Sequence, residues 1–217
     1  MCNFSKMIPL ILRLRKVNHR EVAKAQDMIV QTLYEVFDDA VFHGGTCIWR
    51  CYKGNRFSED IDVYLRRDLV KINKFFEILE KKGLRIERKK IGENSVYSNL
   101  FFNRTAVRFE AIFKKTYGSL REYETAEGNF ITVYALIPEE LIVEKVATYL
   151  KRLKIRDLYD IFFLLRFVNN IDKVRKQLDE LIIKFKQPID EKELRTIILE
   201  GIVPDKDKMV SYIKSRL

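Results

Sequence analysis

The stretch His43–Leu65, HGGTCIWRCYKGNRFSEDIDVYL, decides how the rest of this chain is read. Near its end lie Asp60 and Asp62, which are separated by one residue and lead into an apolar, β-branched run. Because alternate side chains of a strand share a face, both carboxylates are expected to point the same way. Two converging carboxylates repel each other, so a divalent cation is the natural compensating charge. The sequence therefore predicts a metal site at Asp60 and Asp62, with Mg²⁺ as the expected ion and Mn²⁺ as the alternative.

The beginning of the same stretch predicts a phosphate site. Residues 40–42 are typical of a short buried strand, and Gly44, Gly45 and Thr46 form the turn that leads into a helix. Glycines let the backbone approach a ligand, amides at a helix start suit phosphate, and Thr46 adds a hydroxyl. Taken alone, an Asp-x-Asp pair is commonly structural and a Gly-Gly pair is commonly a plain turn. Together they supply what a nucleoside triphosphate with Mg²⁺ needs.

The composition indicates a globular protein with a basic surface. The chain has 217 residues, of which 47% are hydrophobic and 33% are charged, with a formal net charge of +10. This length suits one domain or a domain with a smaller appendage. A basic balance favours polyanion partners such as nucleic acid or nucleotides, and the alternative is a charged, solvated surface of a heat-adapted protein.

The cysteines and the apolar runs predict a cytoplasmic protein that does not cross a membrane. Cys2, Cys47 and Cys51 are odd in number and give no disulfide framework, which suits a reducing compartment. Buried thiols are the preferred interpretation of Cys47 and Cys51, and a zinc site is the alternative. The apolar run that starts at Ile8 does not have the pattern of a signal peptide. No run reaches the length of a membrane span.

The hydrophobic patterns predict an α+β fold, a mixed sheet flanked by helices and followed by a C-terminal helical bundle. The predicted helices of the first part cover 18–38, 46–51 and 68–82, and its strands cover 40–42, 61–65, 84–89, 96–102, 106–113 and 130–136. Residues 114–129 are interpreted as a polar excursion. The five helices that follow are predicted over 139–154, 157–168, 172–186, 191–200 and 205–217, which places a domain boundary between 1–137 and 138–217.

These motifs resemble a known family. A Gly-Gly-Thr turn, then thirteen residues, then Asp-x-Asp with Arg56, Phe57 and Ser58 just before it, resembles the AbiEii/AbiGii-type toxin family of nucleotidyltransferases. That family belongs to the polymerase-β-like nucleotidyltransferase superfamily, which usually has Gly-Ser where this chain has Gly45 and Thr46. The resemblance implies a nucleotidyltransferase fold. It also implies that Arg56 and Ser58 help to hold the triphosphate.

The resemblance implies three further catalytic residues. The superfamily takes a third acid from a strand beside the Asp-x-Asp strand, and Glu110 fits that place, although a simple ion pair with Arg108 is its alternative. After the sheet, a Lys followed by Arg-Asp-x-x-Asp maps onto Lys145 and Asp157, and the flanking Arg156 and Asp160 match as supporting members. Lys145 is also expected near the buried border of its helix, from where a cation offsets pyrophosphate charge. The alternatives are a surface lysine and a helix N-terminal acid.

The predicted function is a Mg-dependent enzyme that moves a nucleoside monophosphate from a nucleoside triphosphate to a hydroxyl acceptor. The resemblance implies a toxin of a type IV toxin–antitoxin or abortive-infection system, with tRNA, another RNA or a protein as acceptor and a cognate antitoxin. Basic clusters at 66–67, 88–90 and 151–156 would attract a polyanionic acceptor. The alternative is a non-catalytic nucleotide- or RNA-binding module of the same fold. A kinase-like reaction is less well supported, because its Gly-rich loop and catalytic Asp-Asn arrangement are missing.

Overall fold

The computed structural model describes residues 8–217 of the chain, and its contacts divide into two compact units. The first, called the sheet unit, comprises the residues up to Lys53 together with Phe57–Ala135. The second, called the helical unit, comprises Gly54–Arg56 together with Leu136–Leu217. The line between Ala135 and Leu136 lies close to the predicted boundary after residue 137. That 1–137 and 138–217 act as separate domains stays a prediction.

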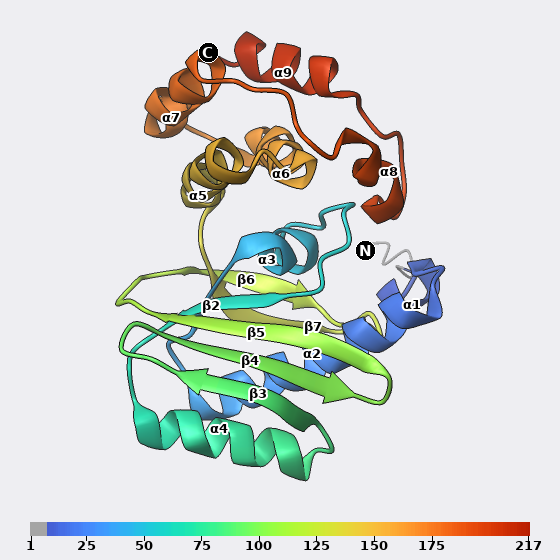
Figure 1. Cartoon of the computed structure of the whole chain (residues 1–217), viewed down its shortest axis with the longest axis vertical. Coiled ribbons are helices and arrows are strands. Elements are labelled where there is room, and N and C mark those ends of the chain that lie inside the picture. Colours follow the sequence, from blue (N-terminus) through green and yellow to red (C-terminus); the bar gives the residue numbers. More distant parts are fainter. Residues whose placement is uncertain (1–7) are drawn as a thin grey trace, which may run out of the picture. The chain divides into compact units, whose positions relative to one another are not determined.

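The sheet unit is built on a seven-stranded mixed sheet with the order β3-β4-β5-β2-β1-β7-β6 (Figure 1). Its strands are β1 Val41–His43, β2 Ile61–Leu65, β3 Arg85–Ile91, β4 Ser95–Phe102, β5 Thr105–Phe113, β6 Ser119–Glu124 and β7 Phe130–Ala135. The pairs β2–β5 and β1–β7 are parallel, and the other neighbours are antiparallel. The predicted α+β class with a mixed sheet flanked by helices is confirmed.

Two helices cover one face of this sheet, as Figure 1 shows. The helix α2 spans Val17–Val36 and α4 spans Leu69–Lys81. Phe75 of α4 lies 5.0 Å from Phe109 between ring centroids, and Tyr34 of α2 lies 6.3 Å from Phe42. The apolar side of each helix therefore packs on the alternate strand residues that the sequence pattern marks as inward-facing.

The ends of α4 follow from its sequence. The Asp68 carboxylate accepts a hydrogen bond from the Lys71 N–H at 3.0 Å and so caps the start of the helix. Gly83 follows the helix with a φ of +91°, a left-handed conformation that glycine adopts without strain. Both signals are local features of the sequence.

The hydrophobic pattern of the sequence does not predict one of the strands. Residues 114–129 were interpreted as a polar excursion, but β6 lies within them and pairs antiparallel with β7. It is an edge strand whose residues alternate poorly in polarity, because Arg121, Glu122 and Glu124 stand where an inner strand would carry apolar side chains. Its pairing comes from the chain reversal into β7 rather than from hydrophobic alternation. The interpretation of this segment was therefore wrong.

The helix α3 spans Gly44–Cys51, and a buried polar group fixes it against the rest of the sheet unit. Arg50 of α3 is ion-paired with Asp27 of α2 and lies over the ring of Tyr123 in β6, at 4.6 Å from the ring centroid. The same Asp27 carboxylate accepts hydrogen bonds from the Tyr123 hydroxyl at 3.1 Å and the Ala126 N–H at 2.7 Å. These contacts hold the helix that begins at the glycine turn.

The helical unit contains helices only beyond Ala135. They are α5 Pro138–Arg152, α6 Ile155–Leu164, η1 Leu165–Phe167, α7 Asp172–Ile183, η2 Glu191–Glu193, α8 Leu194–Ile197 and α9 Lys206–Ser215. The start of α5 is as predicted, with Pro138 at the first position and Glu140 accepting a hydrogen bond from the Ile137 N–H at 3.2 Å. The helix predicted over 191–200 ends early: η2 and α8 together cover 191–197, and Ile198 forms a β-bridge with Arg56.

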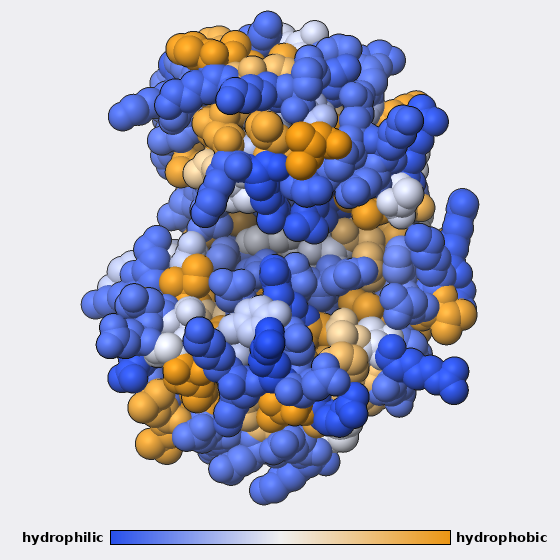
Figure 2. Space-filling view, in the orientation of Figure 1, coloured by the Kyte–Doolittle hydropathy of each residue, from blue (hydrophilic) through white to orange (hydrophobic). Residues whose placement is uncertain are grey.

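The face visible in Figure 2 is largely hydrophilic, and its hydrophobic residues form separate patches. Cys47 and Cys51 are free thiols, Cys47 fully buried, while Cys2 lies outside the described residues. Among residues 8–217, no helix combines the length and the apolar character that a membrane crossing requires.

Candidate active site

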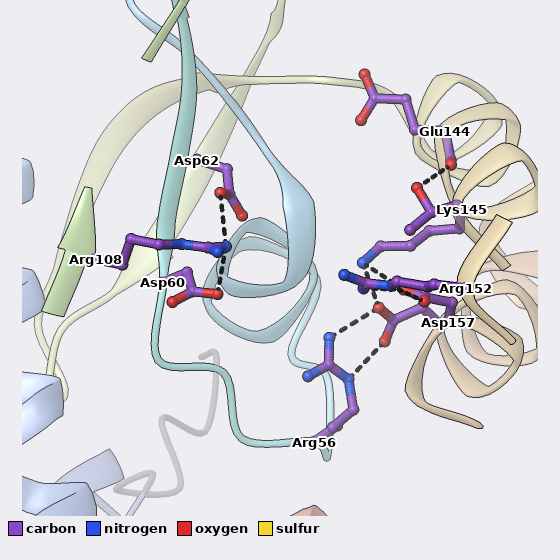
Figure 3. Close-up of polar contacts among 10 residues, drawn as sticks. Arg56, Asp60, Asp62, Arg108, Glu144, Lys145, Arg152 and Asp157 are labelled. Atoms are coloured by element: carbon purple, nitrogen blue, oxygen red, sulfur yellow. Dashed lines mark hydrogen bonds and ion pairs between the residues drawn. The ribbon is translucent and has the colours of Figure 1, made fainter. Parts of the chain in front are cut away.

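Asp60 and Asp62 face the same cation, the guanidinium of Arg108. Asp62 lies in β2 and Asp60 directly precedes that strand. Nη2 of Arg108 in β5 lies 2.7 Å from Asp60 Oδ2 and 3.8 Å from Asp62 Oδ1, and Figure 3 shows both carboxylates turned toward it. The acid side chains are 27% and 18% exposed. The pair therefore faces the same way and remains accessible to solvent.

The glycine turn lies against this pair. The helix α3 begins at Gly44, directly after β1, and Gly44 has a φ of +73°. A Cβ atom at Gly44 would stand 2.2 Å from Asp62 Oδ2, far inside the contact distance. Only glycine fits here, and its backbone brings the first turn of α3 next to the Asp62 carboxylate.

Thr46 supports the acid pair from inside the protein. Its side chain is fully buried, and its hydroxyl donates a hydrogen bond to the backbone oxygen of Asp60. Gln26 of α2 donates to the Ser58 backbone oxygen at 2.9 Å and to the Thr46 hydroxyl at 3.4 Å. The expected phosphate contact from this hydroxyl is therefore replaced by a bond that holds the Asp60 loop. The sequence does not predict this role of Gln26, because nothing in it links α2 to that loop.

Glu110 shares the face of the acid pair. In the register of β2 and β5 it stands opposite Asp62, and neighbours in register project to the same side. The alternative pairing with Arg108 is wrong, because Arg108 binds the aspartates. Within residues 8–217, the Glu110 side chain has no hydrogen bond or ion pair, and no group of three or more His, Cys, Asp or Glu side chains is close enough to hold a metal. A third metal-binding acid is not formed here, and a role for Glu110 as base stays a prediction.

The helical unit contains a second charged group, here called the buried network. Its members are Arg56, Lys145, Arg152, Asp157 and Asp160, shown in part in Figure 3. Arg56 donates two hydrogen bonds to Asp160, both at 2.8 Å. Arg152 donates to both oxygens of Asp157 at 2.7 and 2.8 Å. Lys145 Nζ lies 2.8 Å from Asp160 and 3.5 Å from Asp157.

Electrostatics in the buried network favour the charged forms. Burial alone would raise the pKa of Asp160, but the Arg56 guanidinium and Lys145 outweigh it and hold that pKa below its ordinary value. Burial likewise opposes the charge of Arg56, and the Asp160 carboxylate more than compensates, so the Arg56 pKa is raised. Hydrogen bonds from Arg152 to Asp157 raise the pKa of Arg152 as well.

Several expectations for these residues change. Arg56, expected to hold the triphosphate, is buried and donates two hydrogen bonds to Asp160. Lys145 is also buried, at 7% exposure, so it is not the surface lysine of the alternative interpretation. Of the basic cluster over 151–156, Arg152 binds Asp157 and Lys154 lies 3.3 Å from Asp190. Fewer basic side chains of this cluster are therefore available to bind a polyanion than the sequence indicates.

The residues at the acid pair fit a hard divalent cation. Carboxylate oxygens are the ligands that Mg²⁺ prefers, and Mg²⁺ takes few of them because it keeps positions for water and phosphate. The Arg108 guanidinium already lies where the two carboxylates converge, which shows that the position accepts positive charge.

Solved structures with the same fold include two bacterial proteins. MenT4, a nucleotidyltransferase toxin from Mycobacterium tuberculosis, has a TM-score of 0.66 and 18% identity, with 95% of this chain and 85% of that chain covered. JHP933 from Helicobacter pylori has a TM-score of 0.62 and 17% identity, with 93% and 90% covered. At these identities the likeness establishes the fold.

The sequence itself gives the family. No curated protein matches the chain. A family model described as "Nucleotidyl transferase AbiEii toxin, Type IV TA system" matches residues 30–211, a range that includes the glycine turn, the acid pair and the buried network. The chain therefore belongs to the AbiEii family of nucleotidyltransferase toxins of type IV toxin–antitoxin systems.

Proposed function

We propose that this nucleotidyltransferase moves a nucleoside monophosphate from a nucleoside triphosphate to a hydroxyl acceptor, with a divalent cation held by Asp60 and Asp62. The convergence of these two carboxylates on a single cationic nitrogen carries the proposal. When bound, a divalent cation would orient the phosphates and neutralise charge at the reacting phosphorus. Asp62 lies on β2 and Asp60 directly precedes it, beside the glycine turn, and Arg108 contacts both carboxylates.

The triphosphate is expected at the start of α3. The backbone of Gly44 and Gly45 lies in the first turn of that helix, and amides at a helix start attract phosphate. Ser58 is half-buried in the loop that Gln26 fixes, so its hydroxyl is the side chain there that remains for a phosphate contact.

Lys145 suits the triphosphate because the buried network carries more positive than negative charge. Asp157 and Asp160 are each held by an arginine in two hydrogen bonds. Three cations and two carboxylates leave the network one positive charge in excess, and Lys145 is the member without a carboxylate of its own. That surplus would offset charge on the leaving pyrophosphate, while Asp157 orients Lys145.

The chemical step needs a base at the acceptor. The acceptor oxygen attacks the α-phosphorus, the bond from that phosphorus to the pyrophosphate oxygen breaks, and the hydroxyl proton moves to a carboxylate. Glu110 is the candidate base, since it stands beside Asp62 in register and has no polar partner among residues 8–217.

The acceptor is expected to be RNA, tRNA included. The sheet face that carries Asp62 and Glu110 continues across β4 and β3, where the register places Tyr97 and then Lys90 in the same row. Arg88 lies two residues from Lys90 on that face, and both are exposed. Basic side chains beside an aromatic ring suit a single-stranded nucleic acid, by charge and by stacking.

The reaction is tested with triphosphates that carry label on the α- or the γ-phosphorus, incubated with Mg²⁺ and either RNA or protein. The proposal expects transfer of α-label with release of pyrophosphate, and its loss in Asp60→Asn/Asp62→Asn. A matched control is Asp38→Asn/Asp39→Asn, which removes two carboxylates from weak surface ion pairs of the same unit. Transfer of γ-label, or full activity in the first double variant, would contradict the proposal.

The acceptor is tested through the basic face. Arg88→Gln/Lys90→Gln should weaken RNA labelling and flatten its salt dependence, whereas Lys74→Gln/Lys81→Gln removes two exposed charges from α4, on the opposite face, and should change neither. Labelling of protein but not of RNA would show that the acceptor is a protein, and would contradict the proposed RNA acceptor. An antitoxin gene beside the gene for this chain is the further expectation from the family.

A further inference from the structure

We propose that Arg108 is a positioning residue that acts as the internal counter-ion of Asp60 and Asp62 and competes with the divalent cation for them. It holds the two carboxylates together in the metal-free protein and releases them when the metal binds. This inference rests on the proposed metal site.

The geometry supports competition because both ligands need the same space. A single nitrogen of Arg108, Nη2, reaches Asp60 Oδ2 at 2.7 Å and Asp62 Oδ1 at 3.8 Å. Two neighbouring carboxylates repel each other unless a cation lies between them. The guanidinium therefore provides, without a metal, the compensating charge that the pair requires, and a metal bound by both acids must take its place.

The guanidinium is held loosely enough to leave. The Arg108 side chain is 40% exposed, so water can solvate the group once it is released. Its Nε is buried and has no hydrogen-bond partner within residues 8–217. In the buried network, by contrast, Arg56 uses both Nε and Nη2 on one carboxylate. The hold of Arg108 on the acid pair thus depends on Nη2 alone.

Glu110 lies close enough to bind the Arg108 guanidinium after its release. Glu110 is two residues further along β5 and projects from the same face, at a backbone distance of about 7 Å, which the long arginine side chain can span. Glu110 has no polar partner among the residues described. Metal binding would therefore transfer the guanidinium from the two aspartates toward an unpaired carboxylate, instead of leaving it without a partner.

The test is the affinity of the free protein for Mn²⁺, measured by titration calorimetry without nucleotide. Arg108→Gln should bind Mn²⁺ about tenfold more tightly than the wild type, because the metal no longer displaces a charge-assisted hydrogen bond. Arg104→Gln is the matched control, since Arg104 is exposed in the turn between β4 and β5 and has no partner among residues 8–217. It loses the same charge and should bind almost like the wild type.

Arg108→Lys provides a second variant should the first not fold. An ammonium keeps the charge but does not reproduce the reach of the guanidinium, so an affinity between those of the wild type and Arg108→Gln is expected. Arg108 variants that bind no more tightly than Arg104→Gln would overturn the inference and leave the metal site standing. If neither the wild type nor any variant binds Mn²⁺, both the inference and the proposed metal site fail.

Discussion

The acid pair of the sheet unit and the buried network of the helical unit use the same residue types in opposite ways. Around Arg108, the carboxylates of Asp60 and Asp62 are 27% and 18% exposed. In the buried network, Asp157 and Asp160 are 0% and 1% exposed, and every acid has two or more hydrogen bonds from cations. Access to water, not residue type, separates a group that can exchange its cation from one that cannot.

This difference has an energetic meaning. An exposed ion pair contributes little because water solvates both partners when it breaks. A buried pair contributes little net stability as well, but removing one partner leaves an uncompensated charge in a medium that cannot solvate it. The acid pair is therefore expected to tolerate substitution and to lose function, whereas the buried network should lose stability.

The largest effect on stability is expected for Asp160→Ala. It would remove the carboxylate that accepts two hydrogen bonds from the buried Arg56 and should lower the free energy of unfolding by about 3–5 kcal/mol. Denaturant unfolding measures this, with Asp179→Ala, an exposed acid on α7, as the control. A loss no larger than that of the control would show that the network is not sealed from water.

The same residue gives a pH dependence with a definite sign. Because the pKa of Asp160 is lowered in the folded protein, its contribution to stability is present above its unfolded pKa of 3.8. The contribution is lost as the pH falls below that value toward the folded pKa. Asp160→Asn should therefore unfold with a weaker pH dependence in this acidic range. An unchanged slope in acid titrations of the two proteins would contradict the shift.

Lys145→Met should destabilise less, by about 2 kcal/mol, because each acid keeps its arginine when the lysine is removed. The matched control is Lys151→Met, which removes an exposed lysine from the same helix. If the surplus charge serves the triphosphate, Lys145→Met also lowers label transfer by about 100-fold, within the range for loss of one electrostatic stabiliser. Full activity at saturating triphosphate would remove Lys145 from the reaction.

Gly44→Ala and Gly83→Ala separate backbone strain from damage to the acid pair. Both glycines have positive φ, so alanine should cost about 1–2 kcal/mol at either position. A Cβ at Gly83 meets nothing within 4 Å, whereas at Gly44 it would collide with the Asp62 carboxylate. Only Gly44→Ala should lose Mn²⁺ binding and label transfer. Equal activity of the two variants would show that Asp62 can move without consequence.

The smallest effect is expected for Arg108→Gln in the presence of a chelator. Its ion pair is partly exposed, so the free energy of unfolding should change by less than about 1 kcal/mol. Thermal unfolding, compared with Arg104→Gln, gives the value. A loss of unfolding free energy close to that of Asp160→Ala would mean that water reaches the acid pair as little as it reaches the buried network.

The fold was predictable where neighbours in sequence decide the structure. The strand Ile61–Leu65, the Asp68 cap and the Gly83 stop each depend on a few consecutive residues. The strand Ser119–Glu124 was missed because only its partner β7 makes it a strand. The local hydrophobic pattern therefore predicts most strands of the sheet, but it does not predict an edge strand with many polar residues.

The site was predictable to the same extent. Asp60 and Asp62 are two positions apart in the sequence, so strand geometry predicts that their side chains point the same way. Arg108 is 48 residues from Asp60, and Arg56 is 104 residues from Asp160. Such partners meet only through the tertiary structure. For this reason the sequence predicted the common direction of the two acids and could not assign their cations.

The most direct test of the proposed metal site is anomalous diffraction from crystals that contain Mn²⁺ and a non-hydrolysable triphosphate. We expect a peak within about 2.2 Å of carboxylate oxygens of both Asp60 and Asp62, with the Arg108 guanidinium withdrawn from them. A map with no peak between these acids, and with Arg108 still bound to both, would contradict the account.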